Sequence, residues 1–353
     1  MRIAFDAKRY YHNHTGLGNY SRTLVKGLLE TAPETEVLLY DAKALKRTFA
    51  LGAQARKDGA TLYHGLSNEL PFDIRRSGVP GIVTIHDVCW RTFPGMYHPI
   101  DRTLYDLKYG WAARHADCVL AISESTKRDV MHYMNVPEER IRVIYQPVGA
   151  AYYTPITEAE AKRRLAEAGM DVPGSFMLYV GSVNARKNLL GAVRAMALLP
   201  ASCRMPLVVV GDGREYKKKV LEEVGRLGLG DLILWKRCSE ATQLQALYTL
   251  AHLFVYPSFY EGFGLPVVEA ALSGCPVLTS NVSSLPEAGG PDTLQAVPSD
   301  TEDIARKMEQ GISDTALRLS MRDGARAYAR EMFSPPLLFG KLYELYEEMT
   351  DVK

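Results

Sequence analysis

The chain lacks the features that identify secreted or membrane-spanning proteins. Its 353 residues include only five cysteines, an odd number, and none of them forms a C-x-x-C pair. Such cysteines predict reduced, buried thiols. No apolar run approaches the roughly 18 residues of a membrane-spanning helix, and the opening MRIAFDAKRYY has no apolar signal-peptide core. We therefore expect a cytoplasmic protein.

An excess of charge of one sign is also missing. There are 42 Lys and Arg against 41 Asp and Glu, a formal net charge of +1. Residues 1–155 are mildly basic and the remainder is mildly acidic. A nucleic-acid-binding domain usually carries a strongly basic face, so we expect no nucleic-acid partner. The mild basic balance of residues 1–155 leaves an anionic membrane surface open as a partner.

Short aliphatic runs recur along the chain and alternate with longer amphipathic stretches. This alternation predicts repeated βα units with parallel strands. A chain of 353 residues exceeds the size at which single cores stop growing, so we expect two α/β domains. We place the domain boundary near residue 155 and a change of chain direction at Pro335-Pro336, before a final helix near 337–349. The expected strands are 2–5, 36–40, 61–64, 81–86, 118–123 and 141–145, then 176–181, 206–211, 232–235, 253–256 and 276–280.

The densest group of candidate functional residues follows the expected strand 253–256. The segment YPSFYEGFGLPVVE runs through a glycine-rich turn into a helix, with Pro266 suited to the first helical position. Glu261 is expected in the turn and Glu269 on the helix. The N–H groups of residues 263–265 are expected at the helix N-terminus, where unpaired donors and the helix dipole favour an anion. One short segment thus offers two carboxylates and a phosphate cradle.

A second candidate segment is GSVNARKNL (181–189), directly after an expected strand. Arg186 and Lys187 are expected at the start of a helix, where cations oppose the helix dipole. Their position is explained if an anion binds there, and a diphosphate leaving group needs such countercharge as its negative charge grows. The alternative is an ordinary solvated basic pair.

Two glycines near the N-terminus form a third candidate. Gly16 and Gly18, in TGLGNYS, resemble part of a dinucleotide fingerprint, and Asp41 follows the next expected strand. An NAD-linked oxidoreductase is therefore an alternative. However, Ser21 stands at the third fingerprint position, and ten residues separate the first strand from Gly16, too many for the tight turn required. We expect instead a glycine-rich loop that lets phosphate or sugar approach the backbone.

Histidines supply the remaining candidates. His86 lies at the end of the expected strand 81–86, in TIHDV, where a catalytic and a structural role are both open. His12 and His14 form an H-x-H pair without a third ligand, and we expect no metal site there.

With these residues in view, the chain resembles family 4 of the retaining glycosyltransferases. Members of that family have the GT-B fold, two Rossmann-like domains facing each other across a cleft. EGFGLPVVE resembles the family's E-x7-E signature and GSVNARKN its Arg/Lys loop for the donor phosphates. VVVGDG (208–213) resembles its nucleotide-side strand, and TGLGNYS its N-terminal glycine loop. The resemblance covers nearly the whole chain.

The resemblance implies a role for each matched residue. Domain 1–155, joined by the final helix (337–353), would bind the acceptor, and domain 156–336 would bind the nucleotide sugar. No metal or other cofactor would be needed, and no D-x-D motif occurs. The catalytic residues implied are Glu261, His86, Arg186 and Lys187. The donor-binding residues implied are Gly16, Gly18, Arg186, Lys187, Phe263, Gly264, Leu265 and Glu269.

Within the family, HGLSNELPF and TIHDVCWRTFPGMYHP resemble bacterial mannosyltransferases that build surface polysaccharides from GDP-mannose. This implies a glycan or lipid-linked acceptor and transfer with retention of configuration. The turn Gln146-Pro147-Val148 departs from relatives that carry Asn-Gly, so its contacts are in doubt. A UDP- or ADP-sugar donor, a GT-B sugar epimerase and a non-catalytic scaffold subunit remain alternatives.

Two stretches mix basic with apolar side chains at helical spacing. They are KALKRTFALGAQARK (43–57) and RTLYDLKYGWAAR (102–114). Basic side chains near an anionic surface and apolar neighbours among headgroups favour reversible docking, here on the inner face of the plasma membrane. The alternative is a pair of ordinary amphipathic helices.

Overall fold

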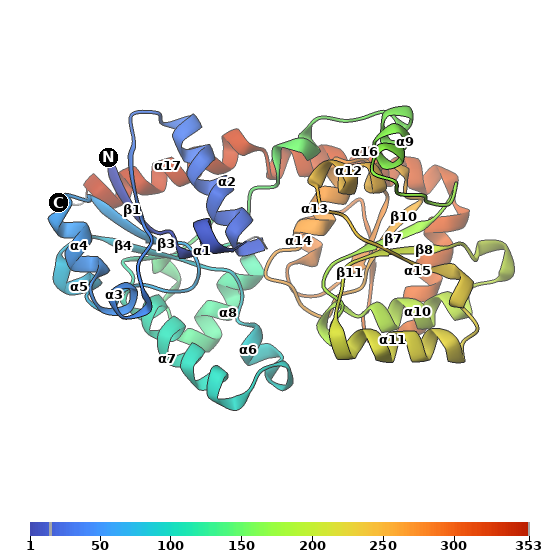
Figure 1. Ribbon diagram of the computed structural model, residues 1–353, viewed down its shortest axis with the longest axis horizontal. Helices are drawn as coiled ribbons and strands as arrows, with labels where there is room; N and C mark the ends of the chain where they lie inside the picture. Colours follow the sequence, from blue (N-terminus) through green and yellow to red (C-terminus); the bar gives the residue numbers. More distant parts are fainter. Residues whose placement is uncertain (14–15, 352–353) are drawn as a thin grey trace. The chain divides into compact units, whose positions relative to one another are not determined.

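The computed structural model describes residues 1–13 and 16–351. Contacts divide the chain into two units. The first unit contains Met1–Pro147 and the C-terminal segment from Phe333, and the second contains Val148–Met332. The sequence placed these two boundaries near residues 155 and 336. Each unit is built on a six-stranded parallel sheet whose strands alternate with helices (Figure 1).

The sheet of the first unit has the strand order β2-β1-β3-β4-β5-β6. The chain places β2 on one side of β1 and β3 on the other, so the direction of growth reverses between β1 and β3. Open α/β sheets bind ligands at such a switch point, outside the carboxyl ends of the strands. The strands are β1 (Arg2–Asp6), β2 (Glu36–Tyr40), β3 (Leu62–Gly65), β4 (Gly81–Ile85), β5 (Cys118–Ala121) and β6 (Ile141–Val143).

Helices connect these strands, and the last helix of the chain also belongs to this unit. Helix α17 packs against α2, from the opposite end of the sequence (Figure 1). The helices are α1 (Lys8–His12), α2 (Gly16–Thr31), α3 (Ala44–Phe49), α4 (Leu51–Lys57), α5 (Ile74–Ser77), α6 (Cys89–Thr92), α7 (Pro99–His115), α8 (Glu124–Met134) and α17 (Pro335–Asp351), with 3-10 turns η1 (Pro94–Met96) and η2 (Glu138–Arg140).

Local sequence explains these elements. Every residue of β3, β4 and β5 is buried, as expected for parallel strands covered on both faces. Ser123 caps α8, since its side chain accepts the N–H of Thr126 at 2.9 Å. Asn135, with a left-handed φ of 54°, ends the same helix.

The sheet of the second unit has the order β12-β11-β10-β7-β8-β9. The chain runs from β7 through β8 to β9 and then returns to the other side of β7 with β10. The switch point of this unit therefore lies between β7 and β10. The strands are β7 (Met177–Val180), β8 (Leu207–Val210), β9 (Ile233–Lys236), β10 (Leu253–Tyr256), β11 (Val277–Ser280) and β12 (Leu294–Ala296).

The helices of the second unit follow the same alternation. They are α9 (Glu158–Glu167), α10 (Leu189–Leu198), α11 (Arg214–Arg226), α12 (Ala241–Leu250), α13 (Leu265–Leu272), α14 (Leu285–Gly289), α15 (Thr301–Ser313) and α16 (Thr315–Met332), with 3-10 turns η3 (Ala150–Tyr153), η4 (Ala185–Lys187), η5 (Ala201–Cys203) and η6 (Gly230–Leu232).

The eleven expected strands all occur, each within two residues of its expected bounds. Strand β12 was not expected, because its three residues, LQA, are too short a run to indicate a strand. Two expectations about connecting segments were wrong. Gly16 and Gly18 lie in the first turn of α2 instead of a loop, and the stretch 43–57 forms two short helices instead of one.

Candidate functional site

The residues that follow β7 and β10 meet at the switch point of the second unit. Arg186 and Lys187 lie in η4, after β7, and Glu261 lies in the turn after β10. Lys187 Nζ is 2.9 Å from Glu261 Oε1, and Arg186 Nη1 is 2.8 Å from Glu261 Oε2. Glu261 is only 8% exposed. Three of the residues singled out from the sequence therefore form one charged cluster.

The charge of this cluster suits an anionic ligand. Burial by itself would raise the pKa of the Glu261 carboxyl group, but Lys187 and Arg186 lower it to about 2. The carboxylate is therefore ionised at neutral pH. Two cations facing one carboxylate leave a net positive charge at the carboxyl end of the sheet.

Asn188 links the η4 turn to the turn that follows β10. Its side-chain amide donates to the carbonyl oxygens of Pro257, at 3.0 Å, and Pro298, at 2.8 Å. Its side-chain oxygen accepts the N–H of Gly191 at 3.2 Å and so caps α10. The sequence placed the two basic residues at the start of a helix. Because Asn188 is the cap of α10, they lie instead in the 3-10 turn before it.

Two hydroxyl groups that sequence reasoning missed also contact Glu261. Tyr256 Oη donates to Glu261 Oε1 at 2.9 Å, and Ser258 Oγ lies 2.8 Å from the same oxygen. Both side chains are fully buried. They lie five and three residues before Glu261, within YPSFYE, so hydroxyl residues between the strand and the glutamate were the available signal.

Helix α13 starts directly after this turn. Gly264 is its N-cap, with a φ of 109° that favours glycine, and Pro266 lies in the first turn as predicted. Phe263 is buried, and its carbonyl oxygen accepts the hydroxyl of Ser284 at 2.8 Å. The binding of an anion to the N–H groups of residues 263–265 stays a prediction.

Glu269 occupies a separate environment on α13. Its carboxyl group is half-buried and accepts the hydroxyl of Tyr248 at 3.2 Å. Burial raises the pKa of Glu269 to about 7, although the Tyr248 hydroxyl lowers it. The two glutamates of the EGFGLPVVE segment thus differ sharply in charge state, a difference that their shared motif does not indicate.

Glycines hold two neighbouring turns of this unit in close contact. Gly181 follows β7, and its N–H donates to the carbonyl of Val210 at 2.9 Å. A Cβ atom on Gly211 would lie 1.9 Å from the Gly181 carbonyl oxygen, and one on Gly213 would lie 1.8 Å from that of Val183. The VVVGDG turn therefore requires glycine for backbone packing beside the Arg186 and Lys187 turn.

His86 lies in the first unit, one residue after β4. Its Nε2 is 2.8 Å from the carbonyl oxygen of Leu66, and its Nδ1 is 3.0 Å from the side-chain nitrogen of Gln146. A carbonyl only accepts, so Nε2 carries the proton and Nδ1 accepts from the Gln146 amide. Burial lowers the pKa of His86 to about 4, which leaves the ring neutral. Gln146, whose contacts the sequence left in doubt, thus orients this histidine.

Gly16 and Gly18 belong to the helix that packs beside His86. Tyr20, one turn further along α2, presents its ring edge-on to His86 with 4.7 Å between ring centroids. A Cβ atom on Gly18 would lie 1.7 Å from the carbonyl oxygen of Asn13, whereas Gly16 has open space. Gly18 is therefore required for the close approach of the segment after α1. Contact of either glycine with a ligand stays a prediction.

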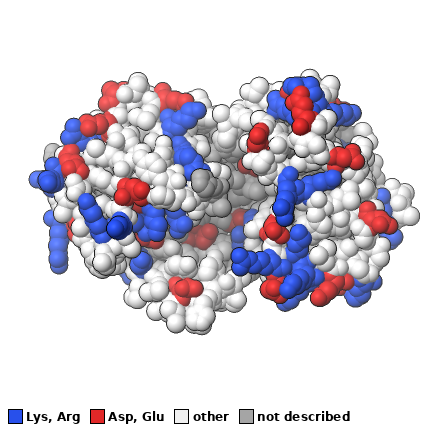
Figure 2. Space-filling view, in the orientation of Figure 1, with Lys and Arg blue, Asp and Glu red and all other residues white. Residues whose placement is uncertain are grey.

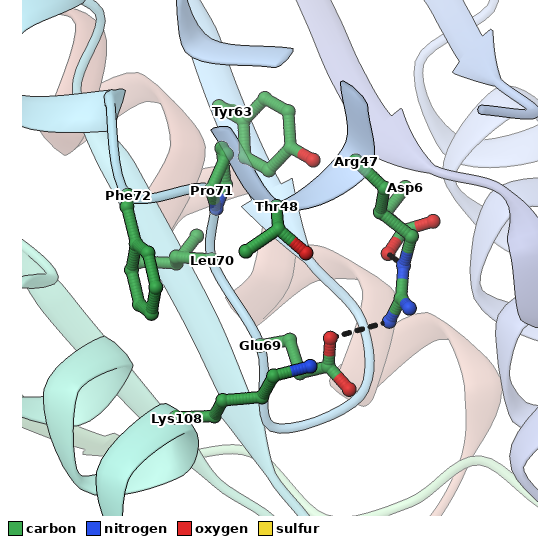
Figure 3. A pocket seen from close by; sticks show the side chains of 9 residues that line it. All are labelled: Asp6, Arg47, Thr48, Tyr63, Glu69, Leu70, Pro71, Phe72 and Lys108. Carbon is green, nitrogen blue, oxygen red and sulfur yellow. Dashed lines mark hydrogen bonds and ion pairs between the residues drawn. The ribbon is translucent and has the colours of Figure 1, made fainter. Parts of the chain in front are cut away.

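A small pocket lies at the switch point of the first unit (Figure 3). Arg47 points into the pocket and donates a hydrogen bond to Asp6, the last residue of β1. It also donates to Glu69, with 2.6 Å between Nη2 and Oε2. Lys108 reaches toward the same pocket from α7 (Figure 3). Arg47 is only 9% exposed, so its assignment to a membrane-facing basic surface was wrong: its charge is balanced by two acidic side chains inside the unit.

Residues 1–13 and 16–351 contain no group of three or more His, Cys, Asp or Glu side chains arranged to hold a metal ion. His12 is exposed and lies 2.8 Å from Asp41. His14 lies outside the described residues.

Figure 2 draws one face of the molecule with its charged side chains coloured by sign. Basic and acidic side chains are interspersed there (Figure 2). Within the part of the chain that the structure describes, no helix is both long and apolar enough to cross a bilayer.

Solved structures with the same fold span the whole chain. Sucrose-phosphate synthase from Thermosynechococcus elongatus is similar with a TM-score of 0.79 and 20% identity, covering 100% of both chains. Anabaena Alr3699/HepE, solved in complex with UDP, is similar with a TM-score of 0.77 and 16% identity, covering 99% of this chain and 100% of that one. The two Rossmann-like units thus have the GT-B fold of nucleotide-sugar glycosyltransferases.

Sequence relatives give the family. The model described as Glycosyltransferase Family 4 matches residues 33–151, and the model described as Glycosyl transferases group 1 matches residues 165–330. O-antigen chain mannosyltransferase B of Escherichia coli is 31% identical over 359 residues, covering 90% of this chain and 92% of the relative. The chain belongs to glycosyltransferase family 4.

A second relative matches only in part. Serotype-specific mannosyltransferase WbdA of Escherichia coli is 35% identical over 207 residues, which cover 57% of this chain and 25% of the relative. The chain is therefore similar to about a quarter of that longer protein. Family membership also sets aside the NAD-linked oxidoreductase suggested by Gly16 and Gly18.

Proposed function

We propose that the protein is a retaining, metal-independent mannosyltransferase. It would transfer mannose from GDP-mannose to a glycan or lipid-linked acceptor in the synthesis of a surface polysaccharide. The observation that carries the proposal is the cluster of Glu261, Arg186 and Lys187 at the switch point of the second unit. The relationship to an O-antigen chain mannosyltransferase supports the choice of sugar.

The cluster suits a nucleoside diphosphate sugar. Arg186 and Lys187 would hold the diphosphate, helped by the backbone of Phe263, Gly264 and Leu265, and their charge would stabilise the phosphate as it departs. Glu261 would accept hydrogen bonds from hydroxyl groups of the sugar.

The remaining roles follow the family resemblance. Glu269 would bind the ribose, and Gly16 and Gly18 would line the phosphate and acceptor side. His86 would lie beside the transferred sugar. Because its Nε2 proton is engaged by Leu66 and its Nδ1 by Gln146, His86 would act as a neutral polar group and not as a general base.

Transfer would proceed on the front face of the sugar. The bond between the anomeric carbon and the donor phosphate oxygen breaks, and the acceptor hydroxyl oxygen bonds to that carbon from the same side. The hydroxyl proton passes to the departing phosphate oxygen, and the nucleoside diphosphate leaves. No protein nucleophile is needed, and Glu261, held by two cations, is poorly suited to be one.

A UDP-sugar donor is the second candidate. The related fold of Anabaena Alr3699/HepE has been solved with UDP and with UDP-glucose. Thermal-shift titration with GDP-mannose, UDP-glucose and ADP-glucose separates the candidates, since a ligand that binds only the native state raises the melting temperature with its occupancy. A larger shift with a UDP- or ADP-sugar would overturn the choice of GDP-mannose.

Product analysis tests the reaction itself. We expect an α-linked product from GDP-mannose, read by NMR, and an unchanged rate after EDTA treatment. An inverted anomer would refute retention, and loss of activity restored by a divalent cation would refute metal independence. Conversion of the donor without an acceptor would point to an epimerase.

We further propose that the first unit docks reversibly on an anionic membrane through α3 and α7. Ile100, Leu104 and Leu107 follow each other at helical spacing on α7 and are 65%, 47% and 62% exposed. Leu45 and Phe49 of α3 are also exposed. Such apolar side chains on the surface of a unit suit a membrane interface.

Contacts place the two helices around one pocket. The Phe49 ring packs on Phe72 at 5.5 Å between centroids, and Phe72 packs on Trp111 of α7 at 4.6 Å. Lys108 of α7 and Arg47 of α3 line the same pocket. Lys43 and Lys46, which are exposed, add positive charge beside the apolar residues. Docking there would bring a lipid-linked acceptor to the first unit.

A further inference from the structure

The carboxylate of Glu261 has four donors around it, and these donors differ in kind. Arg186 and Lys187 are long cationic side chains from a different turn, more than seventy residues away in sequence. Tyr256 and Ser258 are neutral hydroxyls from β10 and the turn that carries Glu261. Both hydroxyl side chains are fully buried, so they cannot move without repacking the unit.

The two cations are thereby occupied by an internal anion. Lys187 Nζ contacts Glu261 Oε1 and the Tyr256 hydroxyl, and it lies 4.9 Å from the centroid of the Tyr256 ring. Arg186 contacts Glu261 Oε2 and the carbonyl oxygen of Tyr260. A diphosphate that binds these cations must compete with the carboxylate, because both bind through the same N–H donors.

We propose that Glu261 occupies Arg186 and Lys187 until the donor binds, and that the diphosphate then replaces its carboxylate as their partner. Tyr256 and Ser258 would hold the carboxylate in place for the sugar. This inference deepens the proposed function and rests on it. The cations turn from Glu261 to the diphosphate, and the two fixed hydroxyls keep the released carboxylate hydrogen-bonded. Glu261 is then free to accept sugar hydroxyls only when a diphosphate is present. Tyr256 and Ser258 are positioning residues in this account.

The first test removes the internal anion. Glu261→Gln keeps the shape of the side chain but not its charge, so Arg186 and Lys187 lose their competing partner. We expect isothermal titration to show GDP binding several-fold tighter than in the wild-type protein, although sugar transfer is lost. Inorganic pyrophosphate, as a probe without a nucleobase, should show the same tightening. Unchanged or weaker binding of both probes would overturn the exchange.

The wild-type titrations separate the two possible failures. If the wild-type protein binds none of GDP, UDP, ADP and pyrophosphate, the proposed function fails. If it binds one of them with an affinity that Glu261→Gln does not raise, the proposed function stands and the exchange fails. Circular dichroism and a melting curve show whether the variant is folded.

The second test concerns the positioning hydroxyls. Tyr256→Phe keeps the ring beneath Lys187 and removes only the hydroxyl. We expect kcat to fall about tenfold or more because the carboxylate is less well held. GDP affinity should fall by less, since Lys187 loses its contact with the hydroxyl but keeps its charge. The matched control is Tyr328→Phe, which removes a hydroxyl bonded to the Glu287 carbonyl at 2.8 Å in the same unit. Equal kcat values in the two variants, or a parallel loss of GDP affinity in Tyr256→Phe, would overturn the positioning role.

Discussion

Arg186 and Lys187 are neighbours in sequence but contact Glu261 from different directions. Arg186 meets Oε2 and the Tyr260 carbonyl, whereas Lys187 meets Oε1 and the hydroxyl of Tyr256. A planar guanidinium and a compact ammonium are not interchangeable in such contacts. We therefore expect each cation to contribute separately to ligand binding.

Removing either cation should weaken the binding of the nucleoside diphosphate. For Lys187→Ala and for Arg186→Ala we expect losses of about tenfold or more in GDP affinity, together with a lower kcat, because each removes charge-assisted hydrogen bonds. Isothermal titration and steady-state kinetics measure both effects. Arg226→Ala is the control, since Arg226 pairs with Glu223 on α11. If GDP affinity is the same in all three variants and wild type, the phosphates bind elsewhere.

Glu269 should make the stability of the protein depend on pH. Burial raises its pKa from 4.5 in the unfolded chain to about 7. The folded state then binds the proton more tightly, so the stabilising contribution is full below about pH 4.5 and is lost as pH rises toward 7. Glu269→Gln, which is always neutral, should therefore gain stability over wild type by about 1 to 2 kcal/mol near pH 8 and little near pH 4.5.

Melting curves of the two proteins at both pH values check this prediction. A difference between Glu269→Gln and wild type that does not change with pH would show that the carboxyl group titrates normally.

At the scale of elements, helix α17 is joined to the first unit by a buried polar chain. The Tyr346 hydroxyl is 2.6 Å from His64 Nδ1, and His64 Nε2 is 2.8 Å from Thr84 Oγ1. The Thr84 hydroxyl is in turn 3.1 Å from that of Tyr20. Burial lowers the pKa of His64 to about 3, so this chain carries no charge. It connects the last helix, two strands and α2, and Tyr20 also contacts His86.

Breaking this chain should destabilise the first unit. Tyr346→Phe leaves one ring nitrogen of His64 without its partner, which we expect to cost about 1 to 3 kcal/mol. Urea unfolding followed by tryptophan fluorescence measures the loss, since Trp90 and Trp111 lie in this unit. Tyr343→Phe, on the same helix, removes a hydroxyl 3.3 Å from exposed Glu34 and should change stability by less than about 0.5 kcal/mol. Equal effects would show that the His64 contact is not stabilising.

At the scale of the whole molecule, both units are built on a six-stranded parallel sheet, but the charged groups at their switch points differ. In the first unit an arginine lies between two carboxylates, Asp6 and Glu69. In the second unit a carboxylate lies between two cations, which leaves positive charge for a ligand. We therefore propose that the anion site lies in the second unit, although the first unit is the more basic part of the sequence.

Docking on a membrane should depend on the apolar residues of α7. We expect the protein to co-sediment with phosphatidylglycerol-containing vesicles at low salt and to be released at high salt, because surface charges are then screened. Leu104→Glu combined with Leu107→Glu should abolish co-sedimentation. The matched control is Leu198→Glu with Leu319→Glu, two leucines of the second unit that are 56% and 54% exposed.

Two results would contradict docking through α7: no co-sedimentation of the wild-type protein at low salt, or equal co-sedimentation of both double variants. The exposed Lys43 and Lys46 are suitable for charge reversal, but Arg47 is not, because its reversal would leave Asp6 and Glu69 without their partner.

The sequence by itself determined the two series of βα units, because hydrophobic periodicity and turn residues are local properties. It also indicated Glu261, Arg186 and Lys187 as candidate site residues, since each follows an aliphatic strand and the ends of parallel strands meet at one edge. The GT-B fold and the family followed from the same segments. The cap at Ser123 was likewise readable from one residue and its neighbours.

Only the tertiary structure decided which partners these residues have. Gln146 orients His86, and Arg47 is buried between Asp6 and Glu69, because residues distant in sequence are packed together there. Tyr256 and Ser258 are near Glu261 in sequence, but only the fold turns their hydroxyls toward its carboxylate. The charge states of Glu261 and Glu269 differ because burial raises the pKa of both carboxyl groups, whereas Glu261 also has two cations beside it that lower its pKa. Burial and partner charges are properties of the folded unit, and no local pattern in the chain contains them.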